Sequence, residues 1–216
     1  MSGETERGWR AAARTQAGSA FFMPEPRPGS ETVVLTAEQM ARTITRIAHE
    51  IVEKNPGVDD LAIVGIHTRG AYLGRRIHAL VREIAGREVA FGDLDISFYR
   101  DDVAARGAIG VVPRTPQPVV KDTHLPFAVD GATVVLVDDV LYTGRTIRAA
   151  IDALFDYGRP AAVQLAVLVD RGHRELPIRP DYVGKNMPTA LDERIDVRVK
   201  ECDGVDEVVL VRARGV

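Results

Sequence analysis

The chain has 216 residues, of which 45% are hydrophobic and 27% are charged, and its formal net charge is −3 at pH 7. This composition is typical of a chain that folds around one hydrophobic core, and the small negative charge means that any nucleic-acid contact must come from a local basic patch. The single cysteine, Cys202, excludes an intramolecular disulfide and a thiolate metal cluster, which favours the cytoplasm, and no apolar run is long enough to predict a membrane span.

The first 30 residues are predicted to be a disordered tail. They are rich in Gly, Arg, Glu, Ala, Pro and Ser, and they lack the apolar segment of a signal peptide. Met23 is an alternative start of a shorter product. Residues 31–216 are predicted to form one folded domain.

The first predicted helix begins at a capping box formed by Thr36 and Gln39 and ends near Lys54, before the breaker sequence Asn-Pro-Gly. One face of this helix carries polar and basic side chains at positions i, i+3, i+4 and i+7. That face is compatible with a solvated surface and with a surface that contacts RNA or phosphate. Its residues are Arg42, Thr45, Arg46 and His49.

Residues 61–66 form an apolar run that predicts a buried strand, and residues 71–86 have the apolar period of a helix. The polar turn between them contains Thr68, Arg69 and Gly70. The guanidinium of Arg69 presents a fork of donors that suits a phosphate group. An arginine at a strand end is also commonly just solvated, so the turn alone leaves both interpretations open.

The middle of the chain is less regular. Residues 89–91 and 94–99 are predicted to be strands or one bent strand. Residues 101–130 contain four prolines and show no clear element, which is typical of a lid over a binding site. Part of this stretch is alternatively a β-hairpin with arms at residues 109–112 and 119–120.

Residues 134–146 combine a valine-rich strand, two adjacent carboxylates that end it, and a small hydroxyl-rich turn before a helix at residues 147–154. Backbone N–H groups at the turn and the helix start favour an anion. Ionised carboxylates accept hydrogen bonds, so they suit ribose hydroxyls or a hydrated cation. The predicted binding residues are Val134, Val135, Leu136, Val137, Asp138, Asp139, Val140, Leu141, Tyr142, Thr143, Gly144, Arg145 and Thr146.

A further buried strand is predicted at residues 161–169. The alternation of apolar strands and helices indicates an α/β fold with parallel βαβ units. Ligands of such sheets bind at the carboxyl ends of the strands. We therefore expect Arg69, Asp138 and Asp170 at the same edge.

The stretch at residues 134–146 resembles the phosphoribosyl-diphosphate (PRPP) signature of type I phosphoribosyltransferases. The resemblance implies a central, mostly parallel sheet flanked by helices, with a flexible lid to which Arg100 contributes. It also implies that Thr68, Arg69 and Gly70 hold pyrophosphate in a loop that often contains a cis peptide. Asp138, Asp139 and Arg69 are the implied catalytic residues. Mg²⁺ is expected as the cofactor with PRPP, held mainly by substrate and water rather than by a protein metal site.

The late segment, residues 169–186, narrows the family. Together with residues 45–50, 66–70 and 95–102 it is similar to bacterial regulatory proteins of pyrimidine operons that are also uracil phosphoribosyltransferases. That resemblance implies conversion of uracil and PRPP to UMP and diphosphate. It also implies control of the operon through its messenger RNA in response to UMP or UTP, and a homodimer or larger homo-oligomer. The implied RNA-binding residues are Arg42, Thr45, Arg46, His49, His173, Arg174, Arg179 and Lys185.

Two alternatives stay open at this point. The protein could bind RNA only and use the PRPP and UMP site as a sensor, or it could be a phosphoribosyltransferase for another base, such as hypoxanthine or orotate. No residue stands out as a general base, and the sequence does not distinguish control of transcription from control of translation.

Overall fold

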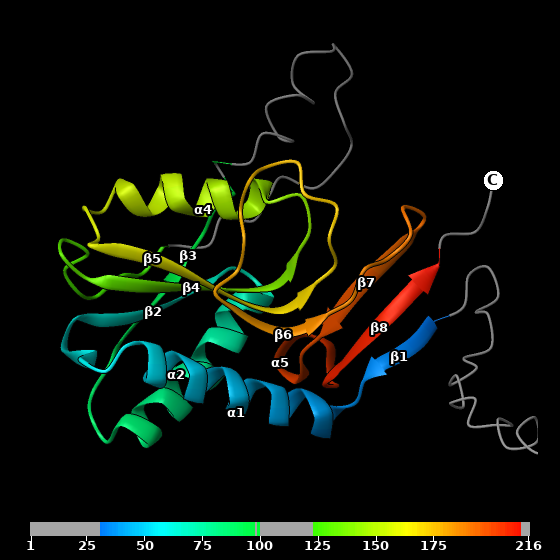
Figure 1. Cartoon of the computed structure of the whole chain (residues 1–216), viewed down its shortest axis with the longest axis horizontal. Helices are drawn as coiled ribbons and strands as arrows, with labels where there is room; N and C mark the ends of the chain where they lie inside the picture. The colour runs from blue at the N-terminus through cyan, green and yellow to red at the C-terminus, as the bar shows by residue number, and fades with distance from the viewer. Residues whose placement is uncertain (1–30, 98, 100–122, 213–216) are drawn as a thin grey trace, which may run out of the picture.

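The computed structural model describes residues 31–97, 99 and 123–212. These residues form a five-stranded parallel sheet and a separate three-stranded antiparallel sheet (Figure 1). In chain order the elements are β1 (Glu31–Leu35), α1 (Ala37–Lys54), a 3-10 turn (Val58–Asp60), β2 (Leu61–Ile66), α2 (Arg69–Ala85), β3 (Ala90–Leu94), β4 (Thr133–Leu141), α4 (Arg145–Phe155), β5 (Ala162–Asp170), β6 (Tyr182–Asn186), β7 (Glu193–Arg198), α5 (Lys200–Asp203) and β8 (Glu207–Arg212).

The parallel sheet has the strand order β3-β2-β4-β5-β6. Helices α1 and α2 cover one face and α4 covers the other (Figure 1). Strands that are covered on both faces must be apolar along their length, which explains why β2 is buried at all six positions. The predicted α/β fold with a central, mostly parallel sheet is confirmed.

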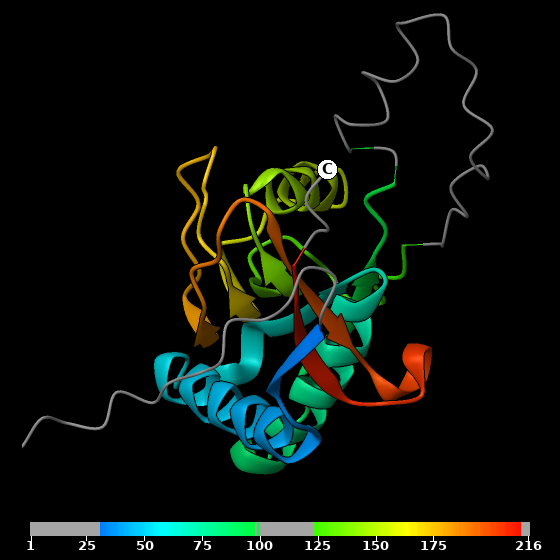
Figure 2. The ribbon, with the colours of Figure 1, turned by 90° about the vertical axis from the view of Figure 1, so that its right-hand side faces the viewer.

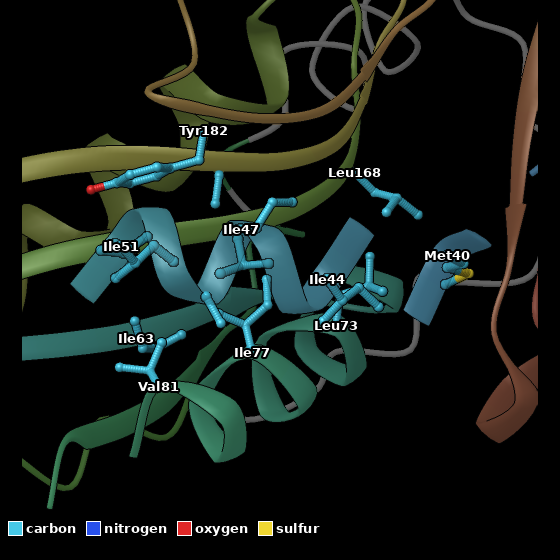
Figure 3. Close-up of a cluster of buried hydrophobic side chains, with 14 of the residues drawn as sticks. Met40, Ile44, Ile47, Ile51, Ile63, Leu73, Ile77, Val81, Leu168 and Tyr182 are labelled. Carbon is cyan, nitrogen blue, oxygen red and sulfur yellow. The ribbon is translucent and has the colours of Figure 1, made fainter. Parts of the chain in front are cut away.

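The core beneath α1 and α2 is made of branched aliphatic side chains that interdigitate between the helices and the sheet (Figure 3). Full burial of one such side chain contributes about 1.5–3 kcal/mol. The spacing of these residues along both helices places them on one face. They include Ile44, Ile47 and Ile51 from α1, Leu73, Ile77 and Val81 from α2, and Ile63 and Leu168 from the sheet.

The predicted limits of the first helix are confirmed. The hydroxyl of Thr36 accepts a hydrogen bond from the backbone N–H of Gln39 at 3.4 Å. The side chain of Gln39 accepts one from the N–H of Thr36 at 2.9 Å, so both halves of the capping box are present. At the other end the N–H of Asn55 donates to the carbonyl of Ile51.

Two glycines bring the start of α2 against the sheet. A Cβ atom on Gly70 would lie 2.5 Å from the carbonyl oxygen of Val137 in β4, and one on Gly65 would lie 2.5 Å from Cα of Ala71. No larger residue fits at such an approach. The first turn of α2 therefore lies directly beside the acidic residues of β4.

Two strand boundaries differ from the prediction. The chain leaves β3 at Leu94, so the strand predicted for residues 94–99 is wrong. Asp95 Oδ1 accepts hydrogen bonds from both the N–H and the hydroxyl of Ser97, and this local turn replaces the strand ladder. In β4 the strand continues through the acidic pair to Leu141 rather than ending at it. The predicted tail and most of the predicted lid or hairpin, residues 100–122, lie outside the described residues.

The antiparallel sheet has the order β1-β8-β7 and was not predicted. It lies beside the parallel sheet, and Figure 2 shows it from its own side. Its strands are joined by charged side chains: Arg198 in β7 pairs with Glu31 in β1 and Glu207 in β8, each at 2.7 Å. Strand β6 also falls within the late segment, for which no strand was predicted. Among the described residues, no helix is both long and apolar enough to cross a membrane.

Candidate active site

The acidic pair lies at the carboxyl end of β4. Asp138 is 7% exposed, and its Oδ1 accepts a hydrogen bond from the N–H of Asp139 at 3.0 Å. Asp139 Oδ1 accepts one from the N–H of Val140 at 2.8 Å. Burial raises the pKa of Asp139, and the Val140 N–H, the neighbouring Asp138 and the positive charge of Arg69 oppose that rise. The pair is thus held by the backbone in a site where a cationic or hydroxyl-bearing ligand favours the ionised form.

Arg69 begins α2, directly after Thr68, and the peptide bond between His67 and Thr68 is cis. Its guanidinium is paired with a carboxylate far along the chain. Nη2 lies 2.8 Å from Asp203 Oδ1, and Nε lies 3.2 Å from Asp203 Oδ2. The hydrogen bond to Asp203 raises the pKa of Arg69, and the charge of Asp139 adds to that effect.

Arg69 and Asp139 lie on the wall of one cavity of about 290 Å³. The rest of the wall comes from β7 and α5, two elements that were not predicted from the sequence. The cavity carries arginine and aspartate side chains and only two aliphatic ones, which suits a charged ligand. The residues of β7 and α5 that line the cavity are Arg194, Ile195, Asp196, Val197, Arg198 and Asp203.

The turn before α4 has the conformation expected of an anion site. Gly144 has φ 92° at the N-cap position of the helix, and a Cβ there would lie 3.4 Å from both Leu176 and Ile178. The hydroxyl of Thr143 accepts a hydrogen bond from the N–H of Arg145 at 3.3 Å. The N-terminal N–H groups and the dipole of the eleven-residue helix α4 favour a negative charge at this turn.

The late segment packs over this turn through Arg174. Its guanidinium donates to the carbonyl oxygens of Tyr142 at 2.8 Å and Ile178 at 3.0 Å, and it pairs with Asp170 at 2.5 Å. The backbone N–H groups of Glu175 and Leu176 donate to the carbonyl of Thr143. Residues 170–178 are thereby fixed to the predicted phosphate-binding turn.

The ring of Tyr142 contacts two side chains of the late segment, Arg171 and His173. The guanidinium carbon of Arg171 is 4.0 Å from the centre of the Tyr142 ring, and the ring of His173 approaches edge-on at 5.9 Å. A hydrogen bond of 2.6 Å joins His173 Nε2 to the carbonyl of Thr189. His173, predicted to bind RNA, thus contacts the turn of the candidate active site.

The basic face predicted on α1 is exposed and adjoins β6. Arg46 donates to the carbonyl oxygens of Val183 and Gly184, at 2.8 and 2.7 Å, and also pairs with Glu50. Arg42 pairs with Glu38, and Thr45 donates its hydroxyl to the carbonyl of Ala41. His49 is exposed on the same helix.

The remaining predicted RNA contacts divide into two groups. Arg179 is exposed and makes no hydrogen bond or ion pair within the described part of the chain, while Lys185 in β6 donates to the carbonyl of Val34 at 3.3 Å. Arg174 is turned inward, as described above. The structure therefore brings α1 and β6 together and places His173 and Arg174 beside the PRPP motif. Arg100, predicted in the lid, lies outside the described residues.

No group of three or more His, Cys, Asp or Glu side chains is arranged to hold a metal ion within residues 31–97, 99 and 123–212. Asp139 nonetheless fits Mg²⁺ in one respect: a carboxylate on the wall of a polar cavity leaves most coordination positions to water and substrate oxygens.

Comparison with known proteins places the chain in a family. A model of the phosphoribosyl transferase domain matches residues 31–200. The bifunctional protein PyrR of a Roseiflexus species is 60% identical over 183 residues, which are 84% of this chain and 96% of that protein. The bifunctional protein PyrR of Chloroflexus aurantiacus is 55% identical over 184 residues, which are 85% of this chain and 97% of that protein.

Solved structures show the same fold at low identity. The hypoxanthine phosphoribosyltransferase of Trypanosoma cruzi is 18% identical and superposes with a TM-score of 0.61, covering 84% of this chain and 97% of that one. Hypoxanthine phosphoribosyltransferase from Staphylococcus aureus gives a TM-score of 0.59 at 19% identity, covering 84% of this chain and 92% of that one. The chain belongs to the type I phosphoribosyltransferases and, within them, to the family of bifunctional PyrR proteins.

Proposed function

We propose that the protein transfers the phosphoribosyl group of PRPP to uracil, which gives UMP and pyrophosphate, and that it regulates a pyrimidine operon by binding the operon's messenger RNA in response to uridine nucleotides. One observation carries the enzymatic part. The acidic pair lies at the end of β4, directly before the turn that leads into α4, and Asp139 shares a cavity with Arg69. Membership of the PyrR family supports both parts.

The reaction breaks the bond from C1′ of the ribose to pyrophosphate and forms a bond from C1′ to a uracil nitrogen. Positive charge develops on the ribose, and negative charge develops on the leaving group. The protein's task is to hold both reactants in line and to stabilise these charges.

Each part of the site has a defined task in this proposal. The turn at Thr143, Gly144, Arg145 and Thr146 binds the 5′-phosphate through N–H and hydroxyl groups. Asp138 and Asp139 hold the ribose hydroxyls, while Thr68, Arg69 and Gly70 hold the pyrophosphate at the cavity. Mg²⁺, bound mainly by substrate and water, neutralises charge on the diphosphate when it is present.

The RNA-binding part rests on the basic face of α1 and on the segment that leads into β6. Arg42, Thr45, Arg46, His49, Arg179 and Lys185 contribute to it directly. His173 and Arg174 contribute by holding the late segment against the nucleotide site, since both make internal hydrogen bonds. We propose at least a homodimer, as the resemblance to the family implies, and an action in the cytoplasm, where the messenger RNA is translated.

An assay with PRPP, Mg²⁺ and a panel of bases tests the enzymatic proposal. We expect UMP from uracil and no nucleotide from hypoxanthine or orotate. Product from another base would favour a different phosphoribosyltransferase. Binding of UMP and RNA without product from any base would favour a sensor. The presence of Arg69 and Asp139 in one cavity favours retained chemistry, because sensing UMP requires no pyrophosphate site.

A further inference from the structure

The turn that joins β7 to β8 holds α2 through carboxylates. Arg76 of α2 forms a double hydrogen bond with Glu201, at 3.0 and 2.6 Å, and contacts Asp206 at 2.8 Å. One residue of the same turn, Asp203, instead binds Arg69 at the start of the helix. Two arginines of α2 therefore have acidic partners in one short turn, but only Arg69 lies at the cavity of the candidate active site.

Asp203 occupies the part of Arg69 that a phosphate group would use. Nε and Nη2 form the edge of the guanidinium that binds two oxygens in parallel, and both atoms donate to Asp203. Nη1 makes no hydrogen bond within the described residues. The backbone N–H of Val199 donates to Asp203 Oδ2 at 2.9 Å, which keeps the carboxylate in place.

The charge of Asp203 also faces the cavity. Its carboxylate lines the cavity together with Arg69 and Asp139. The hydrogen bond from Arg69 lowers the pKa of Asp203, so the group is ionised at neutral pH. A pyrophosphate that enters has two options. It can displace the Asp203 carboxylate from Arg69, or it can accept a hydrogen bond from Nη1 alone while lying near the negative charge of Asp203.

We propose that Asp203 is a built-in competitor for Arg69 that weakens the affinity of the site for pyrophosphate. The inference rests on the proposed function, because it assigns Arg69 to the leaving group. By offering Arg69 an alternative anion, Asp203 favours release of pyrophosphate after transfer. It does not contact the reacting atoms in this proposal and acts only through Arg69.

The substitution Asp203→Asn tests the competition. Asparagine keeps an oxygen for the N–H of Val199 and for one Arg69 donor, but it removes the negative charge. We expect the dissociation constant of magnesium pyrophosphate, measured by titration calorimetry, to fall by about tenfold, as for one charge-assisted pair that no longer has to be displaced. The inhibition constant of pyrophosphate in the forward reaction should fall in parallel.

Glu201→Gln is the matched control. It also removes one negative charge from the same turn, but Glu201 binds Arg76 rather than Arg69. We expect its pyrophosphate affinity to equal that of the wild type. Equal or weaker pyrophosphate binding by Asp203→Asn would overturn the proposal and leave Asp203 with a structural role. Should Asp203→Asn fail to fold, Asp203→Ser provides the same comparison with a neutral oxygen.

The proposed function and the competition between Asp203 and pyrophosphate for Arg69 are tested separately. A wild-type protein that forms no UMP from uracil and PRPP would overturn the proposed function. Calorimetry with magnesium pyrophosphate compares wild type and Asp203→Asn without any turnover, so it decides the competition for Arg69 by itself.

Discussion

Asp139 combines a half-buried position on the cavity wall with a proposed role that requires its charge. We predict that Asp139→Asn lowers kcat by about 10²- to 10³-fold, because removing one preorganised charge stabiliser typically costs about 3–4 kcal/mol of barrier. The fold should persist, since the asparagine oxygen can still accept the N–H of Val140. Steady-state kinetics with uracil and PRPP measure the loss, and near-normal kinetics would contradict the assignment.

The same substitution should stabilise the protein. Burial raises the pKa of Asp139 above its ordinary value of 3.8, so the unfolded carboxyl ionises first as pH rises. Folding free energy is therefore lost between that value and the raised folded pKa, and the loss persists at higher pH. We expect Asp139→Asn to have a higher Tm than the wild type at pH 7, with a difference that shrinks toward pH 3.8.

The exposed Asp152 on α4 supplies the matched control for that thermal comparison. Asp152→Asn should leave Tm nearly unchanged at both pH values, as is usual for surface substitutions. An Asp139→Asn protein that melts below the wild type at pH 7 would mean that its carboxylate stabilises the fold.

At the scale of elements, the contact between α2 and β4 sets the geometry of the site. We predict that Gly70→Ala destabilises the protein by about 1–3 kcal/mol, because its Cβ would overlap the carbonyl of Val137. Activity should fall with it, since Arg69 would shift relative to Asp139. Urea unfolding and kinetics measure the two effects.

Gly57→Ala is the control for this prediction, because nothing lies within 4 Å of the added Cβ. We expect its unfolding free energy to stay within about 0.5 kcal/mol of the wild type. Equal stability of the Gly70 and Gly57 variants would show that α2 can move away from β4 at no cost.

The elements that the sequence predicted well are those with a strong local pattern. β2, β4 and β5 contain continuous apolar runs, α1 has a capping box, and the PRPP motif is contiguous from β4 into α4. β6 was not predicted, because a glycine such as Gly184 is more typical of a loop than of a strand. In the structure that glycine lets α1 approach: a Cβ there would lie 2.7 Å from Thr43 Cγ2.

The part of the site that was missed depends on long-range contacts. Strand β7 reads Glu-Arg-Ile-Asp-Val-Arg, with alternating aliphatic residues as its only strand signal, and α5 has four residues and no usable period. The Arg69–Asp203 pair joins positions 134 residues apart. A single sequence carries no signal for such a pairing, so the cavity between β4 and β7 became visible only in the structure.

At the scale of the whole molecule, the basic face of α1 and the late segment form the predicted RNA surface. We expect Arg42→Ala and Arg179→Ala each to weaken RNA binding and to reduce the slope of log K against log salt by about 1. Neither arginine donates to the backbone in the described structure, so the fold should be unaffected. Filter binding at several salt concentrations measures both effects.

Arg87, which follows α2 and pairs with the exposed Asp59, is the matched control for the loss of one positive charge. Arg87→Ala should leave RNA affinity unchanged. If Arg42→Ala and Arg179→Ala behave like this control, the basic face is only solvated and the RNA surface lies elsewhere.

Two arginines connect the candidate active site with that surface. Arg174 fixes the late segment to Tyr142 of the PRPP motif, and Arg46 of α1 binds the carbonyls of Val183 and Gly184 in β6, the strand at the end of that segment. One short stretch of chain therefore contacts both the turn that holds Thr143 and α1. Allosteric coupling requires such a connection and a difference in affinity between the two states.

The most direct test of this account is the affinity of the protein for the messenger RNA of its own pyrimidine operon, measured with and without UMP. We predict that saturating UMP tightens binding by about tenfold, within the usual range of coupling between two sites. The same affinity in both conditions would contradict the claim that one pocket serves both catalysis and regulation.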